Sequence, residues 1–276
     1  MTARTPLLLI LFCLTLNISS YALLPSKEYR YTPGQLKMNY EEKRVQTQDG
    51  SSIMMWYFPS PRITNKLIIV SHNGVGNMGD NLERIKSFIT LGFNVLCYDY
   101  RGFGASSDFS ISDDVYLYAQ FYKDFEAVYN YAVENYGKRI YLYGWGIGAT
   151  VSTTIGYTKV NTFTIVADGP VSKFSDMPSR FSKIGSRMVI DPEVQANYPD
   201  PSTVLAGTPP INFRGILLIV GSNDHLFVPS DMEGLKAQME HNNVQVHVVN
   251  NKRSTDNYSF DPTMYIRTVG SFFVNN

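Results

Sequence analysis

The chain has 276 residues, which is enough for one large α/β domain with its own core or for two small domains. Lys plus Arg equals Asp plus Glu at 24 each, so no charge excess directs the protein to nucleic acid or to an acidic membrane surface. The hydrophobic content of 44% excludes a largely disordered chain.

The first 22 residues have the order of a secretory signal. Arg4 precedes an uncharged apolar run over residues 7–16, and Ser20-Tyr21-Ala22 places small residues where a signal peptidase reads them. The run is about half of the roughly 20 residues needed to span a bilayer. We therefore expect a signal peptide over about 1–22, a secreted or periplasmic protein and no stable membrane insertion after cleavage. An uncleaved anchor is the alternative.

The chain after residue 22 predicts one α/β domain over 23–276. Strands over 43–48 and 53–58 flank Asp49-Gly50, a strong hairpin signal. Buried strands then alternate with helices, which predicts a mostly parallel sheet covered on both faces. The stretch over about 170–213, rich in proline and serine, predicts a small cap insertion. The expected strands are 66–71, 93–98, 140–143, 163–167, 216–220 and 244–249, and the expected helices are 80–91, 113–136, 148–157, 229–241 and 262–274.

The two cysteines indicate no internal disulfide. Cleavage after Ala22 removes Cys13 and leaves Cys97 alone. Because Cys97 lies inside an apolar strand, we expect a buried and unreactive core thiol.

A glycine-rich turn between the strand at 140–143 and the next helix has the context of a nucleophile elbow, Gly-x-Ser-x-Gly. Here it reads Gly144-Trp145-Gly146-Ile147-Gly148, so Gly146 replaces the nucleophile. The alternative is a dinucleotide fingerprint in which Ala149 takes the last glycine position and Asp168, 22 residues beyond Gly146, is the acid. That fingerprint belongs near the first strand, and this motif is in the middle of the sheet.

Three further blocks follow predicted strands around this turn. They are Ser-His-Asn-Gly-Val-Gly-Asn at 71–77, Asp-Tyr-Arg-Gly-Phe-Gly at 99–104 and Gly-Ser-Asn-Asp-His-Leu-Phe-Val-Pro at 221–229. In this order the blocks resemble the α/β-hydrolase superfamily, and within it the serine-aminopeptidase-like group. The resemblance covers roughly residues 45–273 and implies an α/β-hydrolase fold.

The resemblance also implies a role for each matching position. The backbone N–H groups of Ile147 and of Asn73 or Gly74 correspond to the oxyanion hole, although the family's Gly-Asn order is inverted here. Asp224 corresponds to the triad acid. The triad histidine is expected in the loop at 250–259, which contains none, and Thr255 is nearest its place.

The remaining histidines do not supply a base by position. His72 belongs to the oxyanion loop, His241 ends a helix and His247 lies in a strand, while His225 directly follows Asp224 and stays open as a base. Without serine and histidine, a hydrolase of this type loses on the order of a million-fold in rate. Asp99 and Arg101 are interpreted as a structural pair or turn anchor.

Two functions remain open. The first is a non-catalytic protein that binds a small molecule, peptide or protein partner under the cap. The second is a hydrolase of ester or amide bonds in which Asp168 or Asp224 activates water. No cofactor and no metal are expected, because the chain has no ligand-spaced His, Cys or carboxylate motif.

Overall fold

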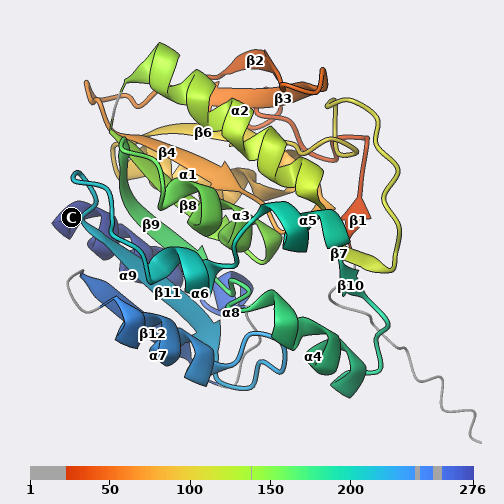
Figure 1. Ribbon diagram of the computed structural model, residues 1–276. Helices are drawn as coiled ribbons and strands as arrows, with labels where there is room; N and C mark the ends of the chain where they lie inside the picture. Colours follow the sequence, from red (N-terminus) through yellow and green to blue (C-terminus); the bar gives the residue numbers. More distant parts are fainter. Residues whose placement is uncertain (1–22, 138, 240–242, 251–256) are drawn as a thin grey trace, which may run out of the picture.

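An eight-stranded sheet organises the protein (Figure 1). The computed structural model describes residues 23–137, 139–239, 243–250 and 257–276. Pairings are parallel except those of β3 with β2 and β6, which are antiparallel. In order across the sheet, the strands are β12 (Val244–Val249), β11 (Gly215–Gly221), β9 (Thr162–Asp168), β8 (Ile140–Trp145), β4 (Leu67–Ser71), β6 (Asn94–Tyr98), β3 (Ser52–Phe58) and β2 (Glu41–Gln46).

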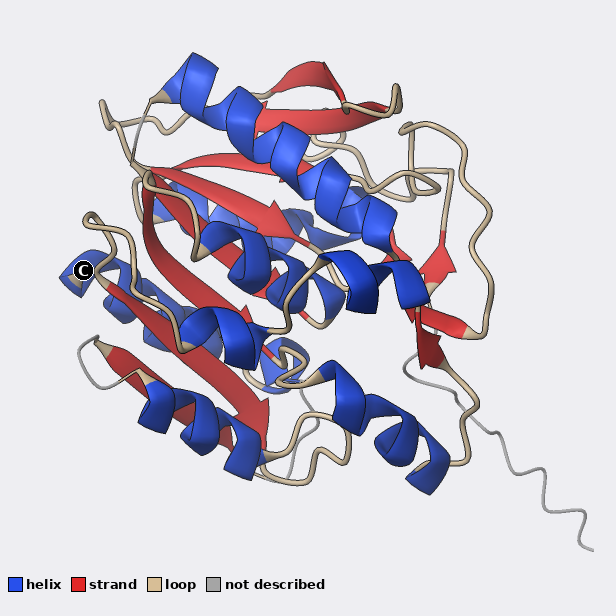
Figure 2. Ribbon diagram, in the orientation of Figure 1, coloured by secondary structure: helices blue, strands red, loops and turns tan. Residues whose placement is uncertain are grey.

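Helices cover both faces of the sheet, as predicted (Figure 2). One core cluster joins the sheet to α2 (Ala119–Tyr136), α3 (Ile147–Gly156) and α7 (Pro229–Gln238). The other joins it to α1 (Leu82–Thr90) and α9 (Pro262–Asn275). Because the central strands are apolar on both faces, they are buried along their full length, which is the pattern of a parallel sheet.

The predicted helix over 113–136 begins too early. Residues Val115–Leu117 form the short strand β7, which pairs in parallel with β10 (Val189–Ile190), and α2 begins only at Ala119. The β-branched and aromatic side chains of this segment favour an extended backbone once a partner strand is present. That partner comes from the insertion, so the local helical periodicity was overridden by a distant contact.

The insertion predicted at about 170–213 consists of short elements. It contains η2 (Phe174–Asp176), α4 (Met177–Lys183), β10, α5 (Pro192–Asn197) and α6 (Pro201–Leu205). Arg180 ties α4 to the core, since its guanidinium donates to Leu226 O at 2.7 Å and pairs with Asp231 of α7. The cap is therefore fixed beside the loop that carries Asp224.

Cys97 is buried in β6 with 1% of its surface exposed, as the sequence predicts. Burial raises the pKa of its thiol well above the usual range, which disfavours the reactive thiolate. Across the described ranges, no helix has both the length and the apolar character that crossing a bilayer requires.

Candidate functional site

The turn from β8 into α3 has the geometry of a nucleophile elbow without a nucleophile. Gly146, between the two elements, has φ 56° and ψ −123°, a conformation that side-chain-bearing residues adopt only under strain. Its N–H donates to Asp168 O at 2.9 Å, which fixes the turn against the end of β9. The strained backbone is thus present although the side chain that it presents in hydrolases is absent.

The two outer glycines of the motif are required by close packing. A Cβ on Gly144 would lie 2.4 Å from Gly148 O, and a Cβ on Gly148 would lie 2.1 Å from Ser71 O. Strand, turn and helix backbones therefore pass too closely for any side chain. Gly144 and Gly148 are glycines because a side chain would not fit, whereas Gly146 is favoured by its positive φ angle.

The predicted oxyanion residues do lie around the elbow. Asn73 Cβ lies 3.0 Å from the position that a Cβ on Gly146 would occupy, and Tyr116 Oη lies 3.7 Å from that position. Ile147 is the first residue of α3, so its N–H has no partner within the helix. Of the two residues predicted for the other half of the oxyanion hole, Asn73 and Gly74, the N–H of Gly74 donates to His72 Nδ1 at 3.1 Å.

The predicted triad acid, Asp224, lies in the loop after β11. Its side chain is buried, and Oδ1 accepts hydrogen bonds from the N–H groups of Leu226 and Phe227, both at 2.8 Å. These bonds make Asp224 an anchor of its own loop. The neighbouring His225 is exposed, whereas the elbow is buried. That exposure places the imidazole outside the buried site and argues against a role as its base.

The other histidines that the structure describes do not complete a triad either. His72 is buried, and burial lowers the pKa of its imidazole to about 3, so the ring is neutral and forms no ion pair with Asp99, 3.7 Å away. His247 lies within β12 and pairs in register with Ile219. His241 and Thr255 lie outside the described residues, so the predicted position of the missing histidine has no structural account.

A buried polar network joins the elbow to the C-terminal helices. Asp168 accepts hydrogen bonds from Asn257 Nδ2 at 2.7 Å and from Tyr265 Oη at 2.8 Å, and Tyr265 Oη lies 3.0 Å from Tyr143 Oη. Burial raises the pKa of Asp168 to about 7, against the hydrogen bonds and the charge of Arg84, which lower it. The nearby carboxylate of Asp224 also raises this pKa.

Arg84 of α1 places a positive charge close enough to lower the pKa of Asp168. Its guanidinium carbon lies 4.0 Å from the ring centre of Trp145 and 4.1 Å from that of Tyr258, so two aromatic faces hold it. Sequence reasoning missed Arg84, Asn257 and Tyr265, because each comes from an element whose register with β9 is set only in the fold. A sequon begins at Asn257, yet its side chain is buried and bonded to Asp168.

Replacement of Asp168 with Asn is expected to change how stability depends on pH. Because the pKa of Asp168 is raised, the folded wild type keeps a proton on this carboxyl over a pH range in which the unfolded chain loses it. The free energy of unfolding of the wild type therefore falls as pH rises from about 4 through about 7. Asn stays neutral throughout. The unfolding free energy of the variant minus that of the wild type should rise by on the order of 3 kcal/mol across this window. Urea titrations at pH 4.5, 6 and 8 measure the difference.

His72 has the opposite pH dependence, since burial lowers its pKa, but it is present in both proteins and cancels in that difference. A difference that stays flat from pH 4.5 to 8 would show that Asp168 titrates normally in the fold.

Asp99 and Arg101 are structural, but they anchor different parts of the fold rather than each other. Asp99 accepts from Met78 N at 2.7 Å and Tyr29 Oη at 2.6 Å. Arg101 pairs instead with Asp49, at 2.8 Å, and with Asp124, at 2.7 Å. Arg101 therefore links the β2–β3 hairpin to α2.

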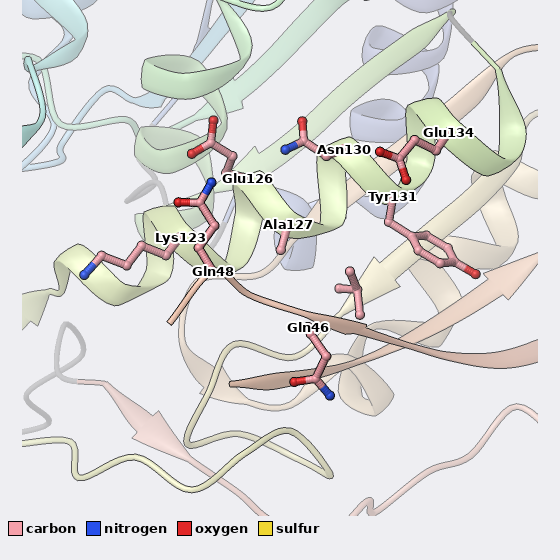
Figure 3. A pocket seen from close by; sticks show the side chains of 9 residues that line it. Gln46, Gln48, Lys123, Glu126, Ala127, Asn130, Tyr131 and Glu134 are labelled. Atoms are coloured by element: carbon pink, nitrogen blue, oxygen red, sulfur yellow. The ribbon is translucent and has the colours of Figure 1, made fainter. Parts of the chain in front are cut away.

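A surface groove of about 210 Å³ lies away from the elbow (Figure 3). It runs between edge strand β2 and α2, where Gln46, Asn130 and Tyr131 contribute to its wall. Two of its charged residues have partners in the protein: Glu126 pairs with Lys159, and Lys123 with Glu193. Among the described residues, no three His, Cys, Asp or Glu side chains gather as metal ligands would.

The sheet order, the strained turn at its centre and the acid loop after β11 together define an α/β hydrolase. A family model described as "Serine aminopeptidase, S33" matches residues 63–201, just over half of the chain. The chain belongs to this family.

Known proteins agree with this assignment at the level of fold. An esterase of Pyrococcus furiosus superposes with a TM-score of 0.74 at 21% identity, covering 92% of this chain and 98% of its own. A proline iminopeptidase of Mycobacterium smegmatis gives 0.63 at 14% identity, covering 85% and 98%. The alpha/beta hydrolase domain-containing protein WAV2 of Arabidopsis thaliana is 31% identical over 97 residues, 34% of this chain and 32% of that protein.

Proposed function

We propose that this protein is a non-catalytic member of its family, which binds a partner or ligand on the hydrolase scaffold without cleaving it. The observation that carries the proposal is Gly146. The elbow keeps φ 56° and ψ −123°, the strained geometry, yet it offers no hydroxyl or thiol to attack a substrate.

Two further features support the proposal. Asp224 is engaged by the loop N–H groups of Leu226 and Phe227, and the described histidines lie at other places in the fold. The N–H of Gly74 donates to His72 Nδ1, so it already has a hydrogen-bond acceptor within the protein. When one member of a catalytic triad is lost, most of the rate enhancement is lost with it. Selection for catalysis then no longer preserves the remaining members.

The alternative, a hydrolase in which a carboxylate activates water, is not favoured by these contacts. Both carboxylate oxygens of Asp168 accept hydrogen bonds from protein side chains, and the group is 1% exposed. A general base must reach the proton that it abstracts, directly or through one water.

Replacement of Gly146 with Ser tests whether a nucleophile alone is what the site lacks. We expect no hydrolysis of a chromogenic ester, because no described histidine stands ready to take the serine proton. The substitution should also lower the unfolding free energy by roughly 1–3 kcal/mol, since a side chain must adopt the strained turn. Asn73 Cβ, 3.0 Å from the new Cβ, adds to that cost.

The double variant Gly146→Ser with Thr255→His is the matched comparison. Weak esterase activity in the double variant alone would support a degenerate triad whose oxyanion groups and Asp224 persist. Hydrolysis by Gly146→Ser alone would contradict the proposal, because it would reveal a base that the protein already holds.

We also propose that the protein is exported, with cleavage after Ala22. The charged start, the short apolar run and the small residues before Leu23 support this. Sequencing of the native protein should begin at Leu23 in material recovered outside the cytoplasm. Recovery of a cytoplasmic protein that retains Met1 would contradict export.

A further inference from the structure

The first described residues lie along the loop that follows β4. Residues 23–29, here called the strap, include β1 (Leu24–Pro25), which pairs in parallel with β5 (Val75–Gly76). Leu24 N donates to Gly74 O at 2.8 Å and Ser26 N donates to Gly76 O at 2.9 Å. The strap therefore binds the predicted oxyanion loop as an added strand.

Leu23 is the buried end of the strap. It is 1% exposed, and its Cδ2 atom lies 2.4 Å from the point that a Cβ on Gly74 would occupy. Ile147 Cδ1 lies 3.0 Å from the same point. The Leu23 side chain thus packs over a glycine and beside Ile147, the residue that directly follows Gly146.

Polar contacts hold the rest of the strap. Asn77 Nδ2 donates to the carbonyl oxygens of Ser26 and Glu28, at 3.2 Å and 2.8 Å. Tyr29 donates from its hydroxyl to Asp99, and its ring centre lies 4.7 Å from that of Trp56. By contrast, both residues of β1 are exposed, Leu24 to 54%, so the loop buries Leu23 and leaves the next two side chains of the strap exposed.

This combination is the chemistry by which proteins recognise an extended peptide. Main-chain hydrogen bonds to a strand edge give affinity, and a buried site for a side chain, here that of Leu23, gives selectivity. The receiving surface consists of Gly74–Asn77 and Ile147, here called the cradle. Its ligand contacts are backbone carbonyls, the amide of Asn77 and an apolar contact that fits an aliphatic side chain.

We propose that the cradle is a peptide-binding site that the strap occupies in cis. An extended peptide with an aliphatic side chain at the place of Leu23 binds there in trans when the strap leaves. This inference rests on the proposed function, because it names an extended peptide as the ligand class that the non-catalytic site holds.

A labelled peptide tests the proposal on the full chain. The probe has the sequence of residues 23–31 with a fluorophore at its carboxyl end, and anisotropy reports its binding. Leu23→Ala weakens the strap by removing its buried side chain, so the variant should bind the probe at least ~10-fold more tightly than the wild type. The control Leu24→Ala, on the exposed face of β1, should stay within about 2-fold of the wild type.

A disulfide lock gives the second measurement and does not depend on the buried residue. Leu24 and Val75 are paired across β1 and β5 and are 54% and 40% exposed. Paired residues on neighbouring strands lie about 4.8 Å apart, within disulfide range. Leu24→Cys with Val75→Cys should bind the probe at least ~10-fold more weakly when oxidised than when reduced.

Equal probe binding by wild type, Leu23→Ala and both redox forms of the lock would overturn the proposal and make the strap a permanent part of the fold. If Leu23→Ala does not fold, as judged by its thermal transition, the comparison of the oxidised and reduced Leu24→Cys with Val75→Cys variant tests the proposal by itself. Ester hydrolysis by the wild type would contradict the proposed function instead, and it leaves the peptide measurements intact.

Discussion

Replacement of Gly148 with Ala should lower the unfolding free energy by about 3 kcal/mol or more, a large effect for one methyl group. The new Cβ would lie 2.1 Å from Ser71 O and 2.8 Å from His72 O. Both obstacles are backbone atoms of β4 and its loop, which cannot rotate away as a side chain can. The clash can be relieved only if α3 moves away from the sheet.

Gly234→Ala is the matched control for that substitution. Gly234 lies in α7, where a Cβ would meet nothing within 4 Å. Alanine should therefore raise stability by roughly 0.5–1 kcal/mol through helix propensity and chain entropy. Urea unfolding of both variants measures the shift in midpoint at constant slope. A Gly148→Ala protein as stable as the wild type would contradict the close packing of the elbow.

Replacement of Arg101 with Met should cost about 3–5 kcal/mol at pH 8. Arg101 Nε donates to Asp124 Oδ1 at 2.8 Å, and Asp124 is fully buried. Methionine keeps much of the side-chain volume but leaves the Asp124 carboxylate without its counter-charge. Burial already raises the pKa of Asp124 to about 6, and Arg101 lowers it, so loss of Arg101 raises it further.

The Arg101→Met deficit should consequently be smaller at pH 5, where Asp124 binds a proton in the folded state. A second substitution, Asp124→Leu, should recover most of the loss, because it removes the unpaired charge. Arg44→Ala, on the exposed edge strand β2, should stay within about 0.5 kcal/mol of the wild type. An equal deficit at pH 5 and pH 8 would show that lost packing, rather than the buried carboxylate, explains the cost.

Much of the fold follows from local patterns in the sequence. The apolar runs that become β4, β6 and β11 have the continuous hydrophobicity of strands buried on both faces, and Gly50, with φ 87°, takes the turn that Asp-Gly predicts. The elbow was predictable from its local glycine spacing, although the packing constraint on Gly148 comes from the distant backbone of Ser71 and His72.

Several contacts of the site could not be predicted, because they join residues that are far apart in the sequence or depend on loop geometry. Leu23 and Gly74 are far apart in the chain, and nothing near Leu23 predicts that it packs against the oxyanion loop. The hydrogen bond from Gly74 to His72 is a matter of loop geometry, so the motif predicted the residues but not where their N–H groups point. Asp168 was predicted at the right end of its strand, whereas its partners Asn257 and Tyr265 come from the far end of the chain.

We propose that the protein has the fold of a serine hydrolase without an activated serine. Fluorophosphonate probes form a covalent bond only with such a serine, so incubation of the purified wild type followed by intact-mass measurement tests it directly. We expect no mass shift under conditions that label an active serine hydrolase of the same fold completely. Stoichiometric labelling of the wild type at any serine would contradict it, since the nucleophile would then lie outside the elbow at Gly146.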